Sequence, residues 1–270
     1  MSRAEAPTPA GPAAVTTTRD GPVALVTLAR AAKANAMDGE ITDALLDAVR
    51  SIRDDDGVGA MVLTGAGDSF SAGGDVGTIE AMQDKNVRAA ILGAHTELFW
   101  EMIRLPCPSV AAVNGAAVGA GVTVALLCDL VVMADDSFLS DPRVALGLLD
   151  GAGGLLLWPL LTSLSAAREH LLLGDRVTAA EAHRLGLANR VADGPEVLDE
   201  SMRLAHRLAK LPRRASAEAR RLLNYPIEQA AGLLDDCSRA ESELFDTPEH
   251  RALVERLARR VASGARAEHR

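Results

Sequence analysis

Short apolar runs alternate with longer amphipathic segments over the first two thirds of the chain. Four of these runs have the length and apolar character of buried strands: residues 23–28, 58–64, 109–113 and 130–133. The run at 23–28 and a shorter one at 14–18 flank a turn, which predicts a β-hairpin. Apolar residues recur at helical spacing over 41–52, after Asp38 as the N-cap, and residues 78–105 predict helix in two pieces. This alternation indicates an α/β fold with parallel crossovers.

The last third of the chain has few strand signals. Residues 187–191 predict one weak strand, and four later segments predict helices: 198–211, 215–223, 227–244 and 248–261. Their Leu and Ala faces would cover the core or pair with another subunit. We divide the chain into a disordered tail at 1–13, which is rich in Ala and Pro, a core at 14–197, and a C-terminal helical oligomerisation region at 198–270.

Two glycine-rich stretches follow two of the predicted strands. Residues 65–75 follow the strand at 58–64, and residues 114–121 follow the strand at 109–113 and open an apolar helix. Small residues let another molecule approach the backbone closely. The first N–H groups of a helix are unpaired and carry partial positive charge, so they can hold an oxygen that becomes negative during a reaction. The alternative is a tightly packed turn that binds no ligand.

The composition narrows the class of protein. The 270 residues are 48% hydrophobic, which suffices for a core, and only 3% aromatic. With a net charge of −9 and so few aromatics, we expect no nucleic-acid partner. No apolar run reaches the roughly 18 residues that cross a bilayer, so we expect no membrane partner. The three cysteines, Cys107, Cys128 and Cys237, have no CxxC spacing, which favours reduced thiols in a cytoplasmic protein. The six histidines have no metal-ligand spacing, so we expect no metal site.

Five groups of residues, taken together, resemble the crotonase superfamily, which includes the enoyl-CoA hydratases and isomerases. They are KANAM at 33–37, FSAGGD at 70–75, AAVNG with GAG and CDL between 111 and 130, LG with GAGG between 146 and 154, and LGD with AAEA and GL between 173 and 187. The resemblance implies a crotonase-like α/β spiral of ββα units at 14–197, followed by the C-terminal helical region. It also implies a homotrimer or hexamer and an acyl-CoA substrate, with coenzyme A as part of the substrate and no separate cofactor.

The resemblance also implies a set of site residues. The backbone N–H groups of Gly74 and Ala120, which lie in the two glycine-rich stretches, would form an oxyanion hole for the thioester oxygen. The loop at 33–35 would border the nucleotide, residues 72–76 would lie along the pantetheine, and we expect Asp75 to act mainly as a turn and capping residue. The implied substrate-binding positions are Lys33, Ala34, Ala72, Gly73, Asp75, Val76, Gly119, Thr123 and Arg143.

The chain departs from the family's hydratases at two catalytic positions. Those enzymes use two glutamates to activate water, and Thr123 and Arg143 stand in their places. Neither side chain can act as a general base near neutral pH. Asp150 lies at or next to a place where other members hold a working aspartate, and we predict that it is the acid–base or nucleophilic residue. The alternative is that Asp150 caps a helix starting near Gly153, and Arg143 is available to pair with Asp150, Asp141 or a substrate carboxylate.

We therefore expect an acyl-CoA-processing enzyme of the hydratase/isomerase type, in which one carboxylate favours isomerisation over hydration. The alternatives are a decarboxylase, C–C lyase or thioester hydrolase in which Arg143 anchors the substrate, or a member that binds acyl-CoA without turning it over. His95 is a further candidate for the acyl pocket, and we expect the other histidines at the surface. Gly77 stands where the family often has a phosphate-facing lysine, and Arg260 is one candidate to replace it.

Overall fold

The structure, a computed structural model, describes residues 13–262, without the side chains of 260–262. The tail predicted at 1–13 therefore falls outside the described residues except at its last position, and so does the side chain of Arg260. Within the described range, no helix has the length and apolar character needed to cross a membrane.

The larger of two sheets contains the strands that the apolar runs predicted. Its order is β1 (Val15–Asp20), β2 (Val23–Leu28), β3 (Ala60–Gly65), β5 (Ser109–Val113), β7 (Leu130–Ala134) and β10 (Arg190–Ala192). The strands β1 and β2 form the predicted antiparallel hairpin, and the other neighbours are parallel. Both β3 and β5 are buried along their whole length, which explains their unbroken apolar runs. The weak strand predicted at 187–191 overlaps β10.

A smaller sheet, absent from our predictions, lies beside the first. It contains β4 (Ser69–Ser71), β6 (Ala116–Val118), β8 (Phe138–Ser140) and β9 (Val177–Thr178). Strands of two or three residues are too short to carry a periodic signal. The chain passes from β3 to β4, from β5 to β6 and from β7 to β8 before entering a helix, so each turn gives one strand to each sheet. This is the expected spiral of ββα units.

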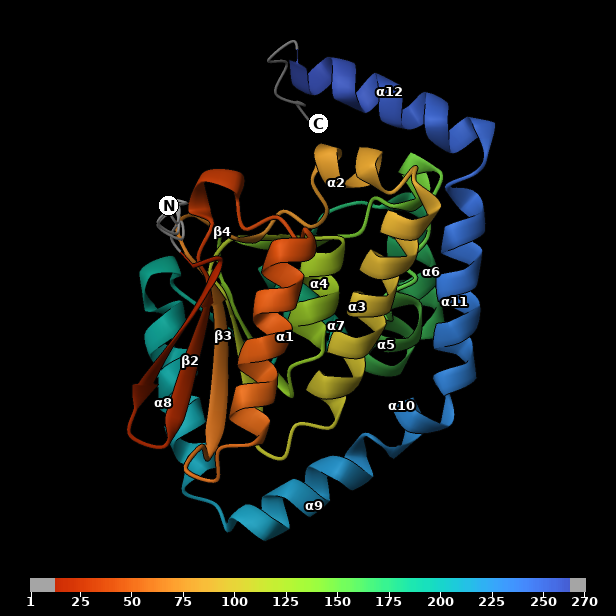
Figure 1. The fold of residues 1–270 in the computed structure, drawn as a ribbon. Coiled ribbons are helices and arrows are strands. Elements are labelled where there is room, and N and C mark those ends of the chain that lie inside the picture. The colour runs from red at the N-terminus through yellow and green to blue at the C-terminus, as the bar shows by residue number, and fades with distance from the viewer. Residues whose placement is uncertain (1–12, 263–270) are drawn as a thin grey trace, which may run out of the picture.

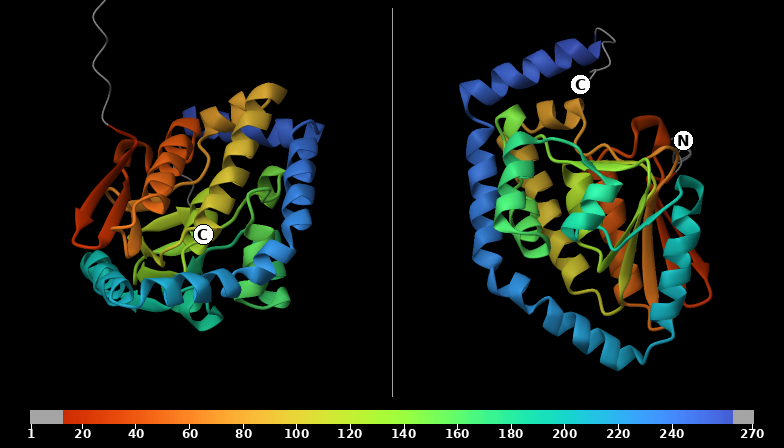
Figure 2. Two further views of the ribbon diagram at one scale, coloured as in Figure 1. Left: turned by 60° about the horizontal axis from the view of Figure 1, so that its bottom comes forward. Right: turned by 180° about the vertical axis from the view of Figure 1, so that it is seen from behind.

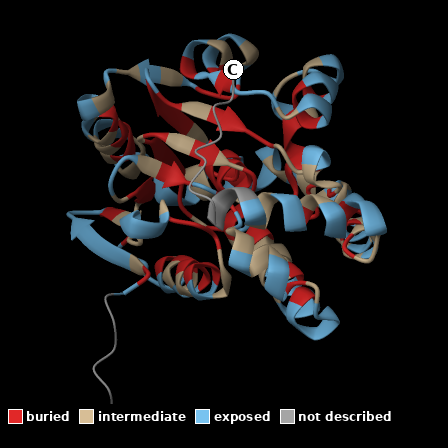
Figure 3. Ribbon diagram, turned by 90° about the horizontal axis from the view of Figure 1, so that it is seen from above, coloured by how far each residue is buried: buried red, intermediate tan, exposed pale blue. Residues whose placement is uncertain are grey.

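Helices cover both faces of the larger sheet (Figure 1). Met61 and Leu63 of β3 pack toward α1 (Gly39–Arg53) and α3 (Lys85–Ile103), whereas the alternate side chains of β3 pack toward α8 (Val197–Ala209). Asp38 caps α1 as predicted, because its Oδ1 accepts a hydrogen bond from the N–H of Ile41 at 3.1 Å. Because α8 packs against the sheet, the first helix of the C-terminal region covers the core. Buried residues are concentrated in the strands and the inner helix faces (Figure 3).

Five further helices belong to the spiral. They are α2 (Val76–Ala81), α4 (Ala120–Leu126), α5 (Gly154–Leu161), α6 (Leu164–Leu173) and α7 (Ala179–Leu185). Three short 3₁₀ turns, η1 (Ala31–Lys33), η2 (Val144–Leu146) and η3 (Gly194–Glu196), connect these elements.

The last four helices run around the outside of the molecule (Figures 1 and 2), and we call them the C-terminal strap. They are α9 (Arg213–Leu223), α10 (Tyr225–Gln229), α11 (Ala231–Leu244) and α12 (Pro248–Ala262). Helix α11 packs beside α3 and α5, and α12 contacts α2 and η2. Arg220 of α9 is buried and fastens the strap to the end of α3. It donates to three backbone carbonyls there, at 2.6–2.7 Å, and to Asp129 at 2.7 Å.

The prediction that all histidines except His95 lie at the surface is wrong for two of them. His170 is 9% exposed and His250 is fully buried, because both stand on the apolar faces of their helices. The Nδ1 atom of His250 lies 2.8 Å from the carbonyl oxygen of Leu146, and its ring packs against Phe245.

Candidate functional site

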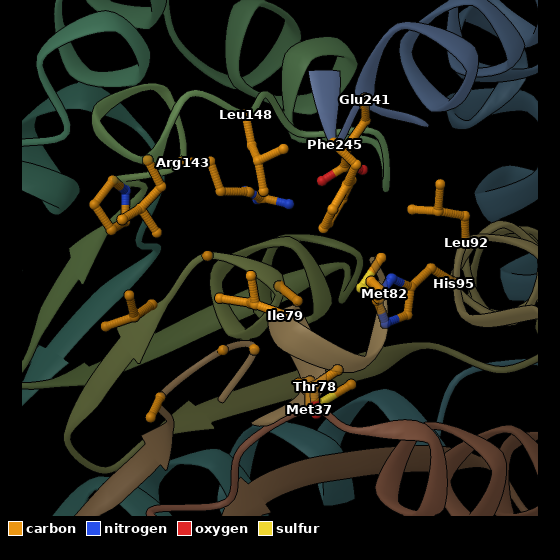
Figure 4. Close-up of a pocket in the computed structure, with 18 residues that line it drawn as sticks. Met37, Thr78, Ile79, Met82, Leu92, His95, Arg143, Leu148, Glu241 and Phe245 are labelled. Carbon is orange, nitrogen blue, oxygen red and sulfur yellow. The ribbon is translucent and has the colours of Figure 1, made fainter. Parts of the chain in front are cut away.

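A pocket opens where the two glycine-rich stretches meet. Half of the predicted site residues line it: Ala72, Gly73, Gly74, Gly119, Ala120 and Arg143. Apolar side chains form most of its remaining wall: Met37, Ile79, Met82, Leu92, Leu146, Leu148 and Phe245. Figure 4 shows Arg143, Leu148 and Glu241 on one side of the pocket, facing Ile79 and Met82, with His95 beside them. The other predicted site residues do not line this pocket: Lys33, Ala34, Asp75, Val76, Thr123 and Asp150.

The two glycine-rich stretches touch each other at Gly73. This residue has a φ of +75°, and a Cβ atom added to it would lie 2.4 Å from the carbonyl oxygen of Val118 and 3.5 Å from the nitrogen of Ala120. The N–H groups of Gly74 and Ala120 have no hydrogen-bond partner in the part of the chain that the structure describes. Ala120 is the first residue of α4, where no helical carbonyl is available to its N–H. The pocket therefore contains two unpaired backbone donors.

Hydrogen bonds hold the first stretch in position. Ser71 Oγ donates to the carbonyl of Asn35 at 2.8 Å and accepts from the N–H of Gly73 at 3.2 Å. The N–H of Met37 donates to the carbonyl of Gly73 at 2.8 Å. The loop around 33–35 therefore holds residues 71–73, two of which line the pocket, in position.

Asp75 acts as a capping residue, as predicted. Its Oδ1 accepts a hydrogen bond from the N–H of Thr78 at 2.6 Å and caps α2. Burial alone would raise the pKa of Asp75, but the hydrogen bonds from Thr78 and the charge of Lys33 outweigh it, so the pKa is lowered. Asp75 therefore stays ionised at neutral pH and is a weak base, which suits a cap better than a general base.

Arg143 pairs with both aspartates that the sequence offered as partners. Its Nη2 lies 2.6 Å from Asp141 Oδ2 and 2.7 Å from Asp150 Oδ2, and its Nε donates to Asp141 at 2.8 Å. Thr123 Oγ1 donates to Asp150 at 2.9 Å. All these groups are largely buried. We call Asp141, Arg143 and Asp150, together with Glu241 below, the charged cluster.

The alternative that Asp150 caps the following helix is wrong. Helix α5 has Gly153 as its N-cap, without a side-chain cap bond. The Oδ1 atom of Asp150 instead accepts from the N–H of Ala152 at 2.7 Å. A Cβ atom on Gly154 would lie 1.8 Å from Asp150 Oδ2, so the glycine leaves the space that this carboxylate occupies.

Glu241 of α11 is a pocket residue that the sequence analysis missed. It is only 6% exposed, and its Oε2 accepts a hydrogen bond from the N–H of Gly151 at 3.0 Å. The buried residues of α11 are Leu234, Cys237 and Glu241, and buried Phe245 follows one turn later. A glutamate in an otherwise apolar helical stripe is a signal that could have identified it.

The charged cluster contains three carboxylates and one cation. Burial is the main cause that raises the pKa of Glu241 to about 8, and the charges of Asp150 and Asp141 raise it further against the opposing effect of Arg143. Burial likewise raises the pKa of Asp150, against the charge of Arg143. Because three buried negative charges exceed one positive charge, the cluster holds a proton near neutral pH.

His95 borders the same pocket from α3. Burial, with a smaller effect of Arg143, lowers its pKa to about 4, so the ring is neutral at pH 7. Its Nε2 is buried and has no hydrogen-bond partner among the residues described. His95 also borders a small apolar recess behind Ala120, which Met37, Leu98 and Leu127 help to line. Within residues 13–262, no group of three or more His, Cys, Asp or Glu side chains is arranged to hold a metal ion.

Comparisons with known proteins agree on one family. The family model described as enoyl-CoA hydratase/isomerase matches residues 18–258. A probable mitochondrial enoyl-CoA hydratase of Dictyostelium discoideum is 30% identical over 230 residues, which cover 85% of this chain and 81% of that protein. A putative enoyl-CoA hydratase of Thermus thermophilus is 38% identical over 194 residues, covering 70% and 76%. The crystal structure of an enoyl-CoA hydratase/isomerase from Mycobacterium paratuberculosis is 37% identical and superposes with a TM-score of 0.87, covering 91% of this chain and 98% of that one.

Proposed function

The chain belongs to the enoyl-CoA hydratase/isomerase family, and on that premise we propose that it converts acyl-CoA thioesters through an enolate held by the N–H groups of Gly74 and Ala120. The observation that carries this proposal is the contact between the two glycine-rich stretches. It puts on one pocket two N–H groups that have no partner within residues 13–262, one of them at the start of a helix. Donors fixed in advance stabilise negative charge that develops on an oxygen, and losing one typically costs about 3 kcal/mol.

The charged cluster supports a reaction that moves a proton. In isomerisation an enolate forms when a proton leaves the α-carbon, and in hydration it forms when a nucleophile adds to the β-carbon of an enoyl thioester. Thr123 and Arg143 occupy the predicted glutamate positions and cannot take a proton near neutral pH. We propose that a carboxylate of the cluster takes the proton, and Asp150 is the one that the sequence predicts. The neutral ring of His95 also borders the pocket, but its pKa of about 4 makes it a weaker base. One acid–base group suffices to shuttle a proton between two carbons, which favours isomerisation over hydration.

The reactions in which Arg143 anchors a substrate carboxylate have less support. Its Nε and Nη2 atoms are bound to Asp141 and Asp150, so only Nη1 is left for a ligand. We keep decarboxylation, C–C cleavage and thioester hydrolysis as outcomes of the test.

We propose that the thioester lies along residues 72–76 and that the acyl group enters the apolar side of the pocket. The nucleotide would then lie toward the loop at 33–35, and coenzyme A would enter and leave as part of the substrate. Asp75, Val76 and Thr123 were predicted to bind substrate, but they line no part of this pocket. Asp75 caps α2, which begins at Val76, and Thr123 lies in α4 and donates to Asp150, so we propose that these residues hold the surroundings of the pocket in shape.

We also propose that the enzyme is a cytoplasmic homotrimer or hexamer. Large apolar side chains are exposed on two surfaces, and such groups favour subunit contacts. They are Leu160, Leu161, Leu164, Leu172 and Leu173 on α5 and α6, and Leu222, Leu223 and Tyr225 on α9 and α10. Light scattering of the purified protein measures the subunit number, and a monomer at micromolar concentration would contradict the proposal.

The test of the proposed reaction is incubation with enoyl-, 3-enoyl-, dienoyl-, aryl- and malonyl-type CoA thioesters in deuterated water, followed by mass spectrometry. We expect uptake of deuterium without added water. A mass gain of one water would mean hydration without the usual glutamates. Loss of carbon dioxide or free coenzyme A would favour the reactions with Arg143 as anchor, and binding without change would refute an enzymatic role on these substrates.

A further inference from the structure

We propose that Glu241 is the catalytic residue that moves the proton at the α-carbon of the substrate. This inference rests on the proposed function, because it assigns a role within the same pocket. It differs from our expectation that Asp150 is that residue.

The position of Glu241 is the first argument. It lines the pocket together with Gly74 and Ala120, which Asp150 does not. Figure 4 shows its carboxyl group on the side of the pocket that Arg143 and Leu148 also form. The side chain is more than nine-tenths buried, and one oxygen, Oε2, is fixed by the N–H of Gly151. No donor among the described residues reaches Oε1, so this oxygen is available to a substrate.

The fit between α11 and the segment at 150–154 is the second argument. A Cβ atom on Gly151 would lie 2.3 Å from Glu241 Oε2 and 3.1 Å from Ser238 Cα. The glycine therefore lets α11 approach closely enough for its carboxylate to reach the pocket. The N–H that fixes Oε2 leaves the carboxyl group oriented and still able to exchange a proton.

The surrounding charges are the third argument. Asp141 and Asp150 face Glu241 from the segment at 141–150, Arg143 faces it from the same segment, Cys237 lies on its own helix, and His95 stands on α3. Two negative groups and one positive group leave a surplus of negative charge near the glutamate. Together with burial, this holds its pKa at about 8, where both protonation states are accessible at physiological pH.

Asp150 is placed for a different task. Its Oδ2 is bound by Arg143 and Thr123, and its Oδ1 is bound by the N–H of Ala152. Both oxygens of this carboxylate are hydrogen-bonded and the residue does not line the pocket, so it cannot reach a substrate. We infer that Asp150 is a positioning residue, which fixes Arg143 and keeps the proton affinity of Glu241 high.

The step balances without a cofactor. The ionised carboxylate of Glu241 accepts the proton from the α-carbon, and the electron pair of the broken C–H bond forms the enolate double bond. The negative charge moves to the thioester oxygen at the N–H groups of Gly74 and Ala120. Glu241 then returns a proton to the α-carbon, or to the γ-carbon of a 3-enoyl thioester, and the thioester carbonyl forms again.

The test compares four proteins: the wild type and the variants Glu241→Gln, Asp150→Asn and Glu243→Gln. Each is incubated with the thioester panel in deuterated water from pH 6 to pH 10, and the rate of deuterium uptake is measured. Glutamine at 241 still accepts the hydrogen bond from Gly151. Glu243 is exposed on the same helix and is the matched control.

We expect Glu241→Gln to lower the rate about 100-fold or more, because a positioned acid–base group contributes at least that much. Glu243→Gln should match the wild type. Asp150→Asn should keep most of the rate and move the rising limb of the pH profile to lower pH, because it removes a negative charge beside Glu241. Should Glu241→Gln not fold, as judged by circular dichroism, Glu241→Asp replaces it, with an expected loss of at least tenfold.

The failures of the two proposals are distinguishable. Uptake by the Glu241→Gln or Glu241→Asp variant at the wild-type rate and pH dependence overturns the role of Glu241 and leaves the proposed function intact. Loss of uptake in Asp150→Asn alone restores Asp150 as the catalytic residue. No uptake by the wild type with any thioester overturns the proposed function, and the role of Glu241 with it.

Discussion

Replacing Gly73 by alanine tests whether the contact between the two glycine-rich stretches positions the oxyanion donors. The added Cβ atom would lie 2.4 Å from the carbonyl oxygen of Val118, about 1 Å closer than an ordinary contact of 3.4 Å. The two stretches must separate by about that distance, and the N–H of Gly74 moves relative to that of Ala120. A displacement of 1 Å at a reacting group typically costs about 100-fold in rate. We therefore expect Gly73→Ala to lower the rate of deuterium uptake about 100-fold.

A second effect of the same substitution must be separated from the first. Gly73 has a φ of +75°, and a left-handed conformation costs a residue with a side chain roughly 1–2 kcal/mol. Gly67 is the matched control, because its φ is +74° and a Cβ atom there would meet only Ala31, at 3.0 Å and 3.9 Å. Both variants should lose the free energy that the left-handed conformation costs, and Gly73→Ala should lose more in urea unfolding because of its clash with Val118. Only Gly73→Ala should lose activity. If Gly73→Ala is as active as Gly67→Ala, the reasoning about the oxyanion hole is wrong.

Three further predictions concern the buried charges. Arg220→Met should lower the free energy of unfolding by about 3–5 kcal/mol, since it removes the cation that Asp129 pairs with and one donor from each of three carbonyls. Urea unfolding measures this, and a loss under about 1 kcal/mol would contradict it. Arg143→Met should destabilise by a similar 3–5 kcal/mol because two buried aspartates, Asp141 and Asp150, lose their cation. Lowering the pH to 5 should restore part of the loss, since burial raises the pKa of Asp150 and Arg143 no longer opposes it. The pKa of Glu241 in the folded chain is raised from 4.5 to about 8. Between pH 4.5 and pH 8 the folded chain therefore binds more protons than the unfolded chain, and the contribution of Glu241 to stability is lost as the pH rises through 8. At pH 9 the free energy of unfolding of Glu241→Gln should therefore exceed that of the wild type by up to about 5 kcal/mol. At pH 4 the two proteins should show no such difference.

The sequence predicted those parts of the fold that depend on neighbouring residues. Most of the run at 58–64 lies in β3, where every position is buried. Asp38 is an N-cap because the N–H from which it accepts is three residues away. The second sheet was missed, since its strands are two or three residues long and are held by pairing between distant segments. No pattern in 116–118 distinguishes β6 from the turn that precedes it.

In the candidate site, too, contacts between residues close in sequence were predicted and contacts between distant residues were not. The pairing of Arg143 with Asp141 and Asp150 was among the alternatives, because these residues are close along the chain. Glu241 meets Gly151 across 90 positions of sequence, and nothing local to either residue indicates that contact. The predicted roles of Gly74 and Ala120 came from resemblance, and the structure adds the unpaired state of both N–H groups.

The residues of the pocket are synthesised in two stages, and those of the C-terminal strap come last. A chain leaves the ribosome from its N-terminus and its folding units form as they emerge. The glycine-rich stretches and the segment at 141–154 are synthesised well before α11, which carries Glu241 and lies beside α3 and α5. The part of the chain that carries the two sheets and the backbone donors is therefore synthesised before the glutamate. If Glu241 moves the proton, proton transfer requires that α11 has been synthesised and has packed beside α3 and α5.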